Sequence, residues 1–529
     1  MKNSGFSIKA GAFCILSIVG AAVLPTNVMA GDVTLKSADG TVNLTGEFLA
    51  FEDNSYMVRT PLGDLRIAAT RVTCEGESCP VFEIDSADVQ IAGSDTLGSG
   101  LVPLLLEGYA GNIQAAATIS AGADNNIVAE LIGDDGYGDN LGSYLVKSAG
   151  SNDAFSTLLE NEAHIGMSSR RIRPDEARAL RDAGAGNMVS PSQEHIVAVD
   201  SLVVITHPSN PIDTLTTEEL GKIYSGEIKD WSEVGGNPGK ILVVDRPEGS
   251  GTRAVFSNAI FGDKPELELA PLEVRIANDN SKVSEVVNEY ENAIGFVGYA
   301  FQRGAKPLTL INECGLSIRA DAFSARTEEY ALQRRLYLYN RADADSEQMS
   351  DFLTYATSPA ADAVISKSGF IGLSIDRRIQ SLDSDRGRAL LNTNVDAYEG
   401  AFMRDMLAKM VEYDRLSTTF RFRTGSSALD ERGLVDMQRL ADYLKAEPDA
   451  EVLFVGFTDD VGAFDSNRKL SEDRANQALA QFEQFLGDDI AGYTLDSAGY
   501  GEIAPSGCNV SSEGRRINRR VEVWVKTAG

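Results

Sequence analysis

Between Ala87 and Leu373, short apolar runs that suit buried strands alternate with segments of helical periodicity. One repeat of this pattern is L-V-V-I at residues 202–205, followed by T-T-E-E-L-G-K-I-Y at residues 216–224. Alternation of this kind is typical of a mostly parallel sheet covered by helices. The sequence therefore predicts an α/β fold for this long central region.

Length and charge limit what the whole chain can be. It has 529 residues, 43% of them hydrophobic, which is enough for about three or four domains that each bury a core. The formal net charge is −30, from 78 acidic and 48 basic residues. This charge would repel a phosphate backbone, and no basic patch is segregated in the sequence, so nucleic acid is not an expected partner.

The N-terminus has the organisation of a secretory signal peptide over residues 1–30. Lys2 and Lys9 flank the start of an apolar run at residues 10–24, and V-M-A precedes Gly31 as a small-residue cleavage site. The apolar run is too short and too early for a lasting membrane span, and no later stretch is long enough. We expect an exported mature protein without a transmembrane span.

Export makes disulfides permissible for the cysteines that follow the signal peptide. Cys74 and Cys79, in C-E-G-E-S-C, are close enough to close a small loop, and a disulfide is favoured over a metal site because no further ligands are nearby. Cys314 and Cys508 lie in different predicted domains, and the sequence leaves their pairing open. The histidines lack metal-ligand spacing, so no metal or other cofactor is expected.

Two flanking segments have simpler patterns. Alternating runs at residues 41–48 and 55–60, separated by turn signals, predict a small β domain over residues 31–84, with a structural or partner-binding role. Residues 376–417 show no strand signal, and Phe402 and Met406 recur at helical spacing, so a helical linker is predicted there.

A candidate anion site follows the strand I-L-V-V in the central region. The next residues, D-R-P-E-G-S-G-T-R-A-V-F at 245–256, form a glycine turn that opens a predicted helix. A helix N-terminus directs backbone N–H groups and the positive end of its dipole toward one point. Ser250 and Thr252 add hydroxyl donors, Gly251 allows close approach, and Arg246 supplies positive charge.

With these motifs, the central region at residues 85–375 resembles the periplasmic phosphate-binding proteins of ABC importers. The likeness continues through I-A-G-S-D-T-L at 91–97, K-S-A-G-S-N-D-A-F at 147–155 and H-I-G-M-S-S-R at 164–170. It implies a bilobed, type II-like binding protein whose two α/β lobes are joined by crossing strands near residues 197 and 297 and close on the ligand by hinge motion.

The resemblance implies a set of ligand-binding residues in four loops. They are Ser94, Thr96 and Leu97 in the first loop, Ser151 in the second, Ser169 and Arg170 in the third, and Arg246, Ser250, Gly251 and Thr252 in the fourth. The third loop departs from the family, which places an Asp there to accept the proton of hydrogen phosphate. Because Arg170 offers only donors, the predicted ligand is phosphate or a related oxyanion such as sulfate.

The C-terminal region carries a second set of motifs. Thr458 and Asp459 precede Arg474 in F-T-D-D-V-G-A-F-D-S-N-R-K-L-S-E-D-R-A, and G-R-R-I-N-R-R-V-E-V follows at 514–523. Residues 418–529 resemble the α+β OmpA-like peptidoglycan-binding domain. The resemblance implies that Asp459 accepts from the ammonium of diaminopimelate and that Arg474 binds its carboxylate with a guanidinium fork. Phe457 departs from the His or Tyr that is common in the family.

Together these features predict a multidomain envelope protein, periplasmic and associated with the peptidoglycan and outer membrane of a Gram-negative bacterium. It would capture phosphate or a related oxyanion, with an ABC permease as a further partner left open. An enzyme with Ser250 as nucleophile is disfavoured, because G-S-G-T is not a nucleophile elbow and no histidine has a paired acid at motif spacing. The alternative is a structural or adhesive wall protein with an empty cleft.

Overall fold

The computed structural model describes most of the chain between residues 32 and 526. The residues outside the description are 1–31, 37–42, 53–54, 62, 69–71, 77, 80–86, 122–125, 263–272, 316, 318–319, 345, 394, 423–430, 448, 488–491 and 527–529. The predicted signal peptide and its cleavage site therefore lie outside the described residues. The chain divides into two compact units, Met1–Phe82 and Glu83–Gly529.

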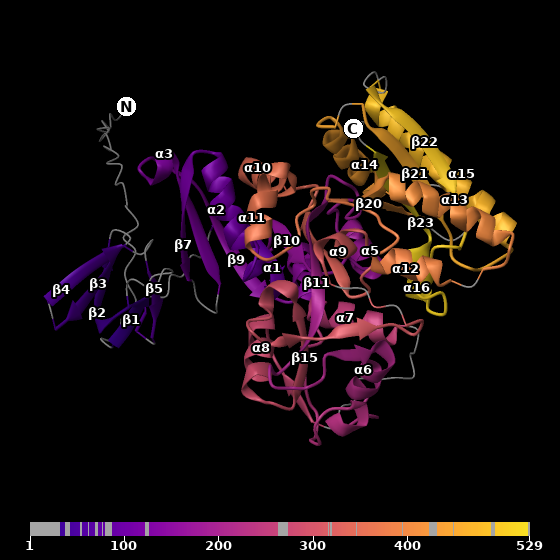
Figure 1. Ribbon diagram of the computed structural model, residues 1–529. Coiled ribbons are helices and arrows are strands. Elements are labelled where there is room, and N and C mark those ends of the chain that lie inside the picture. Colours follow the sequence, from indigo (N-terminus) through magenta and orange to yellow (C-terminus); the bar gives the residue numbers. More distant parts are fainter. Residues whose placement is uncertain are drawn as a thin grey trace, which may run out of the picture. The chain divides into compact units, whose positions relative to one another are not determined.

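The first unit is an antiparallel sheet with the strand order β4-β3-β2-β1-β5 (Figure 1). Its strands are β1 (Asp32–Lys36), β2 (Asn43–Glu52), β3 (Ser55–Thr60), β4 (Gly63–Ala68) and β5 (Thr73–Glu75). Alternate apolar side chains such as Val33, Leu35 and Val58 are buried in one cluster. Cys74 and Cys79 form the disulfide that the sequence favours, and they pack against this cluster.

The second unit begins with a mixed sheet that we divide into two lobes. Lobe 1 contains β6 (Val89–Ser94), β7 (Ala115–Ala121), β8 (Ile127–Ile132), β9 (Asn140–Ala149), β10 (Ile165–Ser168) and β18 (Gln333–Asn340). Lobe 2 contains β13 (Leu242–Asp245), β14 (Val274–Ile276), β15 (Ala293–Gly298) and β16 (Lys306–Pro307), with β12 (Thr214–Thr216) and β17 (Thr309–Ile311) as a separate pair. The long strand β11 (Glu194–Thr206) belongs to both lobes.

The prediction of a mostly parallel sheet was wrong in its details. Parallel pairs occur around β6, which lies between β9 and β10, and around β13, which lies between β14 and β15. The other pairs in this sheet are antiparallel, because β7, β8 and β9 follow one another as neighbours and β11 pairs antiparallel with both β15 and β18. Apolar strands do not reveal their direction, so the sequence pattern could not distinguish these arrangements.

Helices cover both lobes. In lobe 1 these are α1 (Asp95–Gly98), α2 (Val102–Asn112), α3 (Gly133–Gly136), α4 (Ser151–Leu159), α5 (Pro174–Asp182), α10 (Glu347–Thr357), η5 (Pro359–Ala361) and α11 (Asp362–Lys367). In lobe 2 these are α6 (Thr217–Tyr224), η3 (Trp231–Val234), α7 (Gly251–Phe261), α8 (Asn280–Glu289), η4 (Tyr299–Phe301) and α9 (Ala322–Arg326).

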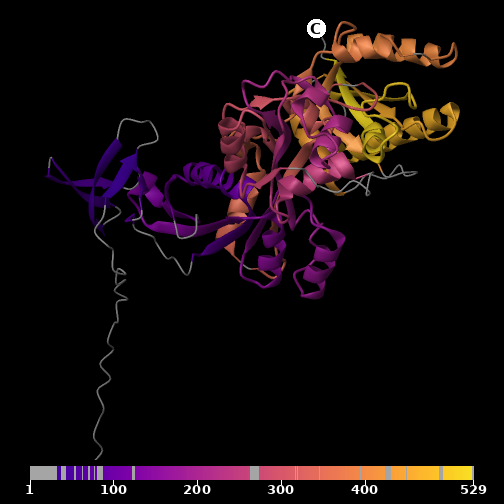
Figure 2. The same ribbon diagram turned by 90° about the horizontal axis from the view of Figure 1, so that it is seen from below.

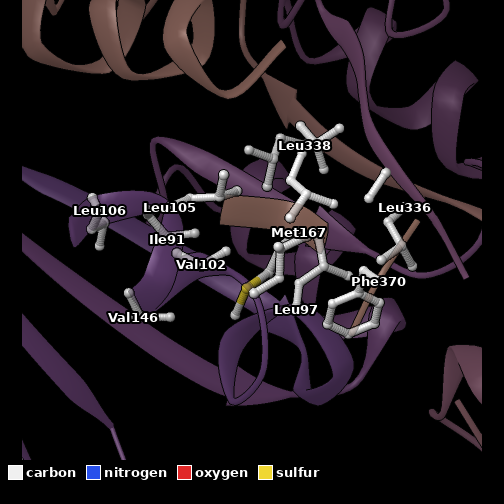
Figure 3. Packing of buried hydrophobic residues seen from close by; sticks show 14 of the residues in the cluster. Ile91, Leu97, Val102, Leu105, Leu106, Val146, Met167, Leu336, Leu338 and Phe370 are labelled. Atoms are coloured by element: carbon white, nitrogen blue, oxygen red, sulfur yellow. The ribbon is translucent and has the colours of Figure 1, made fainter. Parts of the chain in front are cut away.

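The core of lobe 1 lies between its strands and α2 (Figure 3). Ile91 and Met167 on neighbouring strands face Val102 and Leu105 of α2, and all four are fully buried. Full burial of one such side chain stabilises a fold by about 1.5 to 3 kcal/mol. This packed layer holds the ends of β6, β9 and β10 in fixed positions, and the candidate ligand-binding loops start from those ends.

The two lobes are joined by β11 and by the chain that enters β18. Strand β11 pairs with β18 up to Ser201 and with β15 from Leu202 onward. Beside it, Leu202 N donates to Leu332 O over 2.7 Å, and the Tyr330 hydroxyl donates to Leu202 O over 2.8 Å. The predicted crossing near residue 197 agrees with this arrangement, but the second crossing lies near Leu332. Residue 297 lies on β15, which stays within lobe 2.

The C-terminal domain is a sheet with the order β19-β20-β23-β21-β22 and helices on both faces. Its elements are β19 (Arg377–Arg378), α12 (Asp385–Leu391), α13 (Glu399–Glu412), β20 (Asp414–Arg421), α14 (Glu431–Leu444), β21 (Glu451–Phe457), α15 (Phe464–Leu486), β22 (Thr494–Gly499), α16 (Ser512–Asn518) and β23 (Arg520–Lys526). One core cluster joins α14 and α15 to the sheet, and α13 packs on the opposite face (Figure 2).

The predicted helical linker at residues 376–417 is part of this domain. It contains β19 and the beginning of β20, which pair with each other in the C-terminal sheet, although the sequence showed no strand there. Strand β19 has only two residues, which is too short to give an alternating pattern. Met406 and Met410 of α13 are buried against Val455 and Trp524 of the sheet.

A second disulfide connects the C-terminal domain to lobe 2. It joins Cys314 to Cys508, a pairing that the sequence left open, across a separation of 194 residues. A second contact involves lobe 1, because Arg335 on β18 pairs with Asp436 of α14 at 3.4 Å. The C-terminal domain is therefore attached on both sides of the point where the lobes are joined.

We predict that replacing Cys314 and Cys508 with Ala lowers the free energy of unfolding by about 2 to 4 kcal/mol, because this disulfide closes a long loop and restricts the unfolded chain. Denaturant titration of the mature protein measures the change. The matched control replaces Cys74 and Cys79, which are separated by only five residues and should contribute less. Unchanged stability of the Cys314 and Cys508 variant would contradict the prediction.

Candidate functional site

Four helices begin shortly after the ends of parallel strands in the two lobes. These helices are α1, α4, α7 and α8, which follow β6, β9, β13 and β14. Their ends come together across the lobes, since Asn280 at the start of α8 donates from Nδ2 to Asp95 over 3.0 Å and to Thr96 over 3.1 Å in α1. Free N–H groups and helix dipoles make this junction suitable for an anion.

Predicted loop residues from both lobes meet at this junction. The hydroxyl oxygens of Thr96 and Thr252 are 3.4 Å apart, and those of Ser151 and Ser169 are 3.1 Å apart. Gly251 packs so closely on the second pair that a Cβ atom would collide with both hydroxyls. All of these residues are buried. Motifs that are far apart in the sequence thus form one place in the fold.

Arg246 and Ser94 carry buried donors without a partner among the described residues. The Arg246 side chain is 1% exposed and uses Nη2 to contact Asp95 at 3.1 Å and the carbonyl of Asn278 at 2.9 Å. Its Nε and Nη1 atoms, and the Ser94 hydroxyl, have no hydrogen-bond partner in the described part of the chain. A buried donor left unsatisfied costs about 1 to 3 kcal/mol, so these groups suit an acceptor brought in by a ligand.

Two other predicted residues have structural roles that limit what they can offer. The Ser250 hydroxyl oxygen caps α7 by accepting from the N–H of Arg253 over 3.3 Å, which leaves its O–H as the group for a ligand. The Leu97 side chain is fully buried in the core of lobe 1 (Figure 3). Any contact of Leu97 with a ligand would therefore come from its backbone.

The structure does not support the predicted role of Arg170. Its guanidinium forms two bonds with Glu176, at 2.6 and 2.8 Å, and one with Asn152 at 2.7 Å. It also lies 4.9 Å from the ring centroid of Phe155. Glu176 neutralises its charge, and Asn152 and Phe155 of α4 and the carbonyl of Arg171 supply further contacts, so Arg170 is a support of the third loop. Its Nε atom has no hydrogen-bond partner among the described residues.

Sequence reasoning missed Arg334, the side chain that connects the two halves of the junction. From β18 it donates through Nη1 to Thr252 over 2.7 Å and through Nη2 to Thr96 over 3.2 Å. It also pairs with Asp200 of β11 at 2.7 Å. Burial raises the pKa of Asp200 and lowers the pKa of Arg334, so each depends on the other to stay ionised. The only sequence signal was a charged residue inside an apolar strand.

The candidate wall-binding residues also meet in the structure. Asp459 accepts from Arg519 over 2.7 Å, and both are largely buried. Burial lowers the pKa of Arg474 to about 10, with Arg519 adding to this shift and Asp459 opposing it, so the three groups are electrostatic neighbours. The buried Thr458 hydroxyl lacks a partner among the described residues. The cluster offers one carboxylate and two guanidinium groups for a zwitterion.

Position 457, where the sequence departs from its family, faces the protein interior. Phe457 is fully buried, with its ring centroid 6.4 Å from that of Tyr500. The guanidinium of Arg520 lies 4.3 Å from the same ring, and Arg520 also bonds to Glu522 over 2.8 Å. Phe457 and Arg520 therefore stabilise the domain from inside.

A buried charge network connects the C-terminal domain to the segment before β18. Glu329 accepts from both terminal nitrogens of Arg415, at 2.9 and 3.2 Å, and from the Ser506 hydroxyl at 2.7 Å. Arg415 also pairs with Glu522 at 3.1 Å. Burial acts to raise the pKa of Glu329, but the arginines, Arg415 first, lower it more strongly, to about 2.

Comparisons with known proteins match the two folds of the second unit. A family model described as a PBP superfamily domain matches residues 80–360, more than half of the chain, and the chain belongs to that superfamily. A model of the OmpA family matches residues 421–519. The protein therefore combines a PBP-like α/β domain with a C-terminal OmpA domain, and both resemblances seen in the sequence are confirmed.

Individual relatives match the same two regions. A phosphate-binding protein PstS from Borreliella burgdorferi is 26% identical over 236 residues, which are 43% of this chain and 77% of that protein. Outer membrane porin F from Pseudomonas aeruginosa is 36% identical over 117 residues, 22% of this chain, and the match spans 33% of the porin.

A solved structure of a phosphate ABC transporter substrate-binding protein with bound phosphate, from Clostridium perfringens, has a TM-score of 0.42 and 23% identity. It covers 54% of this chain and 98% of its own. Among the helices of the described residues, none combines the length and apolar character needed to cross a membrane.

We predict that acid weakens the attachment of the C-terminal domain. The pKa of Glu329 is about 2 in the folded protein, below the ordinary value of about 4.3 in an unfolded chain, so its stabilising effect is complete above that ordinary value and is lost as the pH falls from there toward 2. The free energy of unfolding, measured across this pH range, should decrease toward acid. Glu329→Gln should make that decrease smaller. Glu412→Gln, at an exposed carboxylate, is the control. Identical pH profiles for Glu329→Gln and the wild type would refute the assignment.

Proposed function

We propose that this protein captures phosphate or a related tetrahedral oxyanion between its two lobes and is held non-covalently on peptidoglycan by its OmpA domain. The single observation that carries the oxyanion proposal is Arg246, which is buried with a charged side chain and has donors that no described residue accepts. Such a group is stable in a site built for an anion. The hydroxyls of Thr96, Thr252, Ser151 and Ser169 add further polar groups from both lobes at the same junction.

The similarity to phosphate-binding proteins supports this ligand class for the present chain. Opening and closing would occur by hinge motion where β11 and the segment before β18 connect the lobes, as in type II-like binding proteins. In the closed arrangement, Asn280 and Thr252 of lobe 2 contact Asp95 and Thr96 of lobe 1. Delivery to an ABC permease remains a further part of this proposal.

We propose binding rather than catalysis at this junction. A hydrolase would need a base beside Ser250, but the three histidines have partners elsewhere. His164 accepts from Gln90, His195 bonds to Asn340, and His207 bonds to Ser209. The hydroxyl oxygen of Ser250 is occupied as the cap of α7, which also disfavours its use as a nucleophile.

The wall-binding proposal rests on the cluster of Asp459, Arg474 and Arg519. Its two kinds of charge match the ammonium and carboxylate of diaminopimelate, and the match to the OmpA family supports this use. We infer export to the periplasm of a Gram-negative envelope, directed by the signal peptide at residues 1–30.

We propose the domain boundaries 31–84, 85–375 and 376–529. Residues 376–417, which the sequence predicts as a linker, are included in the last domain because β19 and α13 belong to its sheet and core.

We predict that Arg246→Gln weakens oxyanion binding by about 1.5 to 3 kcal/mol, because the ligand loses charged hydrogen bonds. Isothermal titration calorimetry of the mature protein with phosphate and with sulfate measures the change. Arg178→Gln on α5, an exposed position outside the junction, should leave the affinity unchanged. If Arg246→Gln folds normally and binds both anions as tightly as the wild type, the site is misplaced.

We predict that Asp459→Asn and Arg474→Gln each abolish sedimentation of the protein with insoluble peptidoglycan. Each change leaves one charge of the diaminopimelate without its partner at a largely buried site, which costs about 2 to 5 kcal/mol. Asp460→Asn is the matched control, since Asp460 is exposed and next in the sequence. If Asp460→Asn releases the protein and Asp459→Asn does not, the assignment of the ligand contact to Asp459 is wrong. Retention of all three variants on peptidoglycan would contradict the wall-binding proposal.

A further inference from the structure

Arg334 fixes the direction of two hydrogen bonds at the junction of the lobes. A guanidinium can only donate, so the hydroxyl oxygens of Thr252 and Thr96 are acceptors in their contacts with Nη1 and Nη2 of Arg334. Each hydroxyl therefore keeps its own O–H for another acceptor. Because Arg334 reaches Thr96 in lobe 1 and Thr252 in lobe 2, it sets this direction on both sides of the closed junction.

Asn280 completes the arrangement at Thr96. The Asn280 Oδ1 atom accepts from the backbone N–H of Gly298 over 3.2 Å, which fixes the orientation of the amide. Nδ2 then donates to Thr96 over 3.1 Å and to Asp95 over 3.0 Å. The Thr96 oxygen thus accepts from both Arg334 and Asn280, which occupies its two lone pairs. The Thr96 hydroxyl can therefore act only as a donor, and the Thr252 oxygen lies 3.4 Å from it as an acceptor. The Thr252 oxygen then accepts from both Arg334 and Thr96, and its O–H remains for a ligand.

The carboxylates at the junction are occupied by protein donors as well. Asp200 accepts from Nε and Nη2 of Arg334 at 3.0 and 2.7 Å, and from the N–H of Tyr299 at 3.2 Å. Asp95 accepts from Asn280 and contacts Arg246 at 3.1 Å. Among these groups, the Thr252 O–H and the Nε and Nη1 atoms of Arg246 are left as donors.

We propose that Arg334 is a specificity-determining residue of the oxyanion site: it occupies one acceptor position on Thr96 and one on Thr252, and with Asn280 and Thr96 occupying the others it leaves the Thr252 hydroxyl only as a donor, which discriminates against protonated ligand oxygens. This inference rests on the proposed oxyanion function. A fully deprotonated tetrahedral dianion presents an acceptor at every corner, whereas a phosphate that carries protons has fewer oxygens that fit. Arg334 acts through the threonines, so it is a positioning residue for the ligand.

The test compares the affinities of sulfate and phosphate in the wild type and in Arg334→Met, by calorimetry at one pH. Without Arg334 the threonine oxygens regain acceptor capacity, so the ratio of the affinity for phosphate to the affinity for sulfate should rise. We expect a rise of about threefold to tenfold, which is the contribution of one hydrogen bond to a binding constant. Because Arg334→Met leaves Asp200 buried and unpaired, the double variant Arg334→Met/Asp200→Asn provides the same measurement in a neutral core. Arg341→Met is the control for a buried arginine, because Arg341 lies just after β18 and pairs with Asp343 outside the junction.

The outcomes separate the two proposals. A shift of the ratio toward phosphate in the double variant, with no shift in Arg341→Met, supports the role of Arg334. Equal losses of affinity for sulfate and phosphate would show that Arg334 only holds the lobes together, and would overturn the inference while the oxyanion function stands. A wild-type protein that binds neither anion would overturn the proposed function itself.

Discussion

The buried ion pair between Arg334 and Asp200 is the interaction on which the candidate oxyanion site depends. Asp200 lies on β11, which passes between the lobes, and Arg334 lies on β18, just after the segment that forms the second crossing. Burial opposes ionisation of both groups, so the pair is stable only while its bidentate geometry is kept. The same guanidinium contacts Thr96 and Thr252, and the arrangement of the lobes is thereby linked to the orientation of these two candidate hydroxyls.

The OmpA domain is attached, by a disulfide and by ion pairs, next to the segments that join the two lobes. Cys508 is covalently joined to Cys314 of lobe 2, while Glu329, which lies just before β18, is bound by Arg415 of β20. Asp436 of α14 contacts Arg335 of β18. These contacts lie on either side of the segment that connects the lobes. The PBP-like domain and the OmpA domain are therefore joined by a disulfide and by ion pairs, in contrast to two modules on a flexible tether.

Much of this architecture was predictable from local patterns. The glycine turn before α7 and the alternating strands of the first unit gave correct elements, because their signals lie within a few neighbouring residues. Strand direction, the crossing near Leu332 and the pairing of Cys314 were not predictable, because they depend on contacts between distant segments. Arg170 and Arg334 show the same limit at the site, because both are arginines near apolar strands. Only the fold reveals that Arg170 forms an ion pair with Glu176, whereas Arg334 donates hydrogen bonds to Thr96 and Thr252.

The proposed function requires one chain to hold an oxyanion and the cell wall at the same time. The most direct measurement incubates insoluble peptidoglycan with radiolabelled phosphate, with and without the mature protein, and counts the label that sediments. The account predicts that label sediments only when protein is present, in proportion to the bound protein, and that excess unlabelled phosphate releases the label but leaves the protein on the wall. Protein that sediments without carrying label, at phosphate concentrations that saturate its free form, would contradict the account.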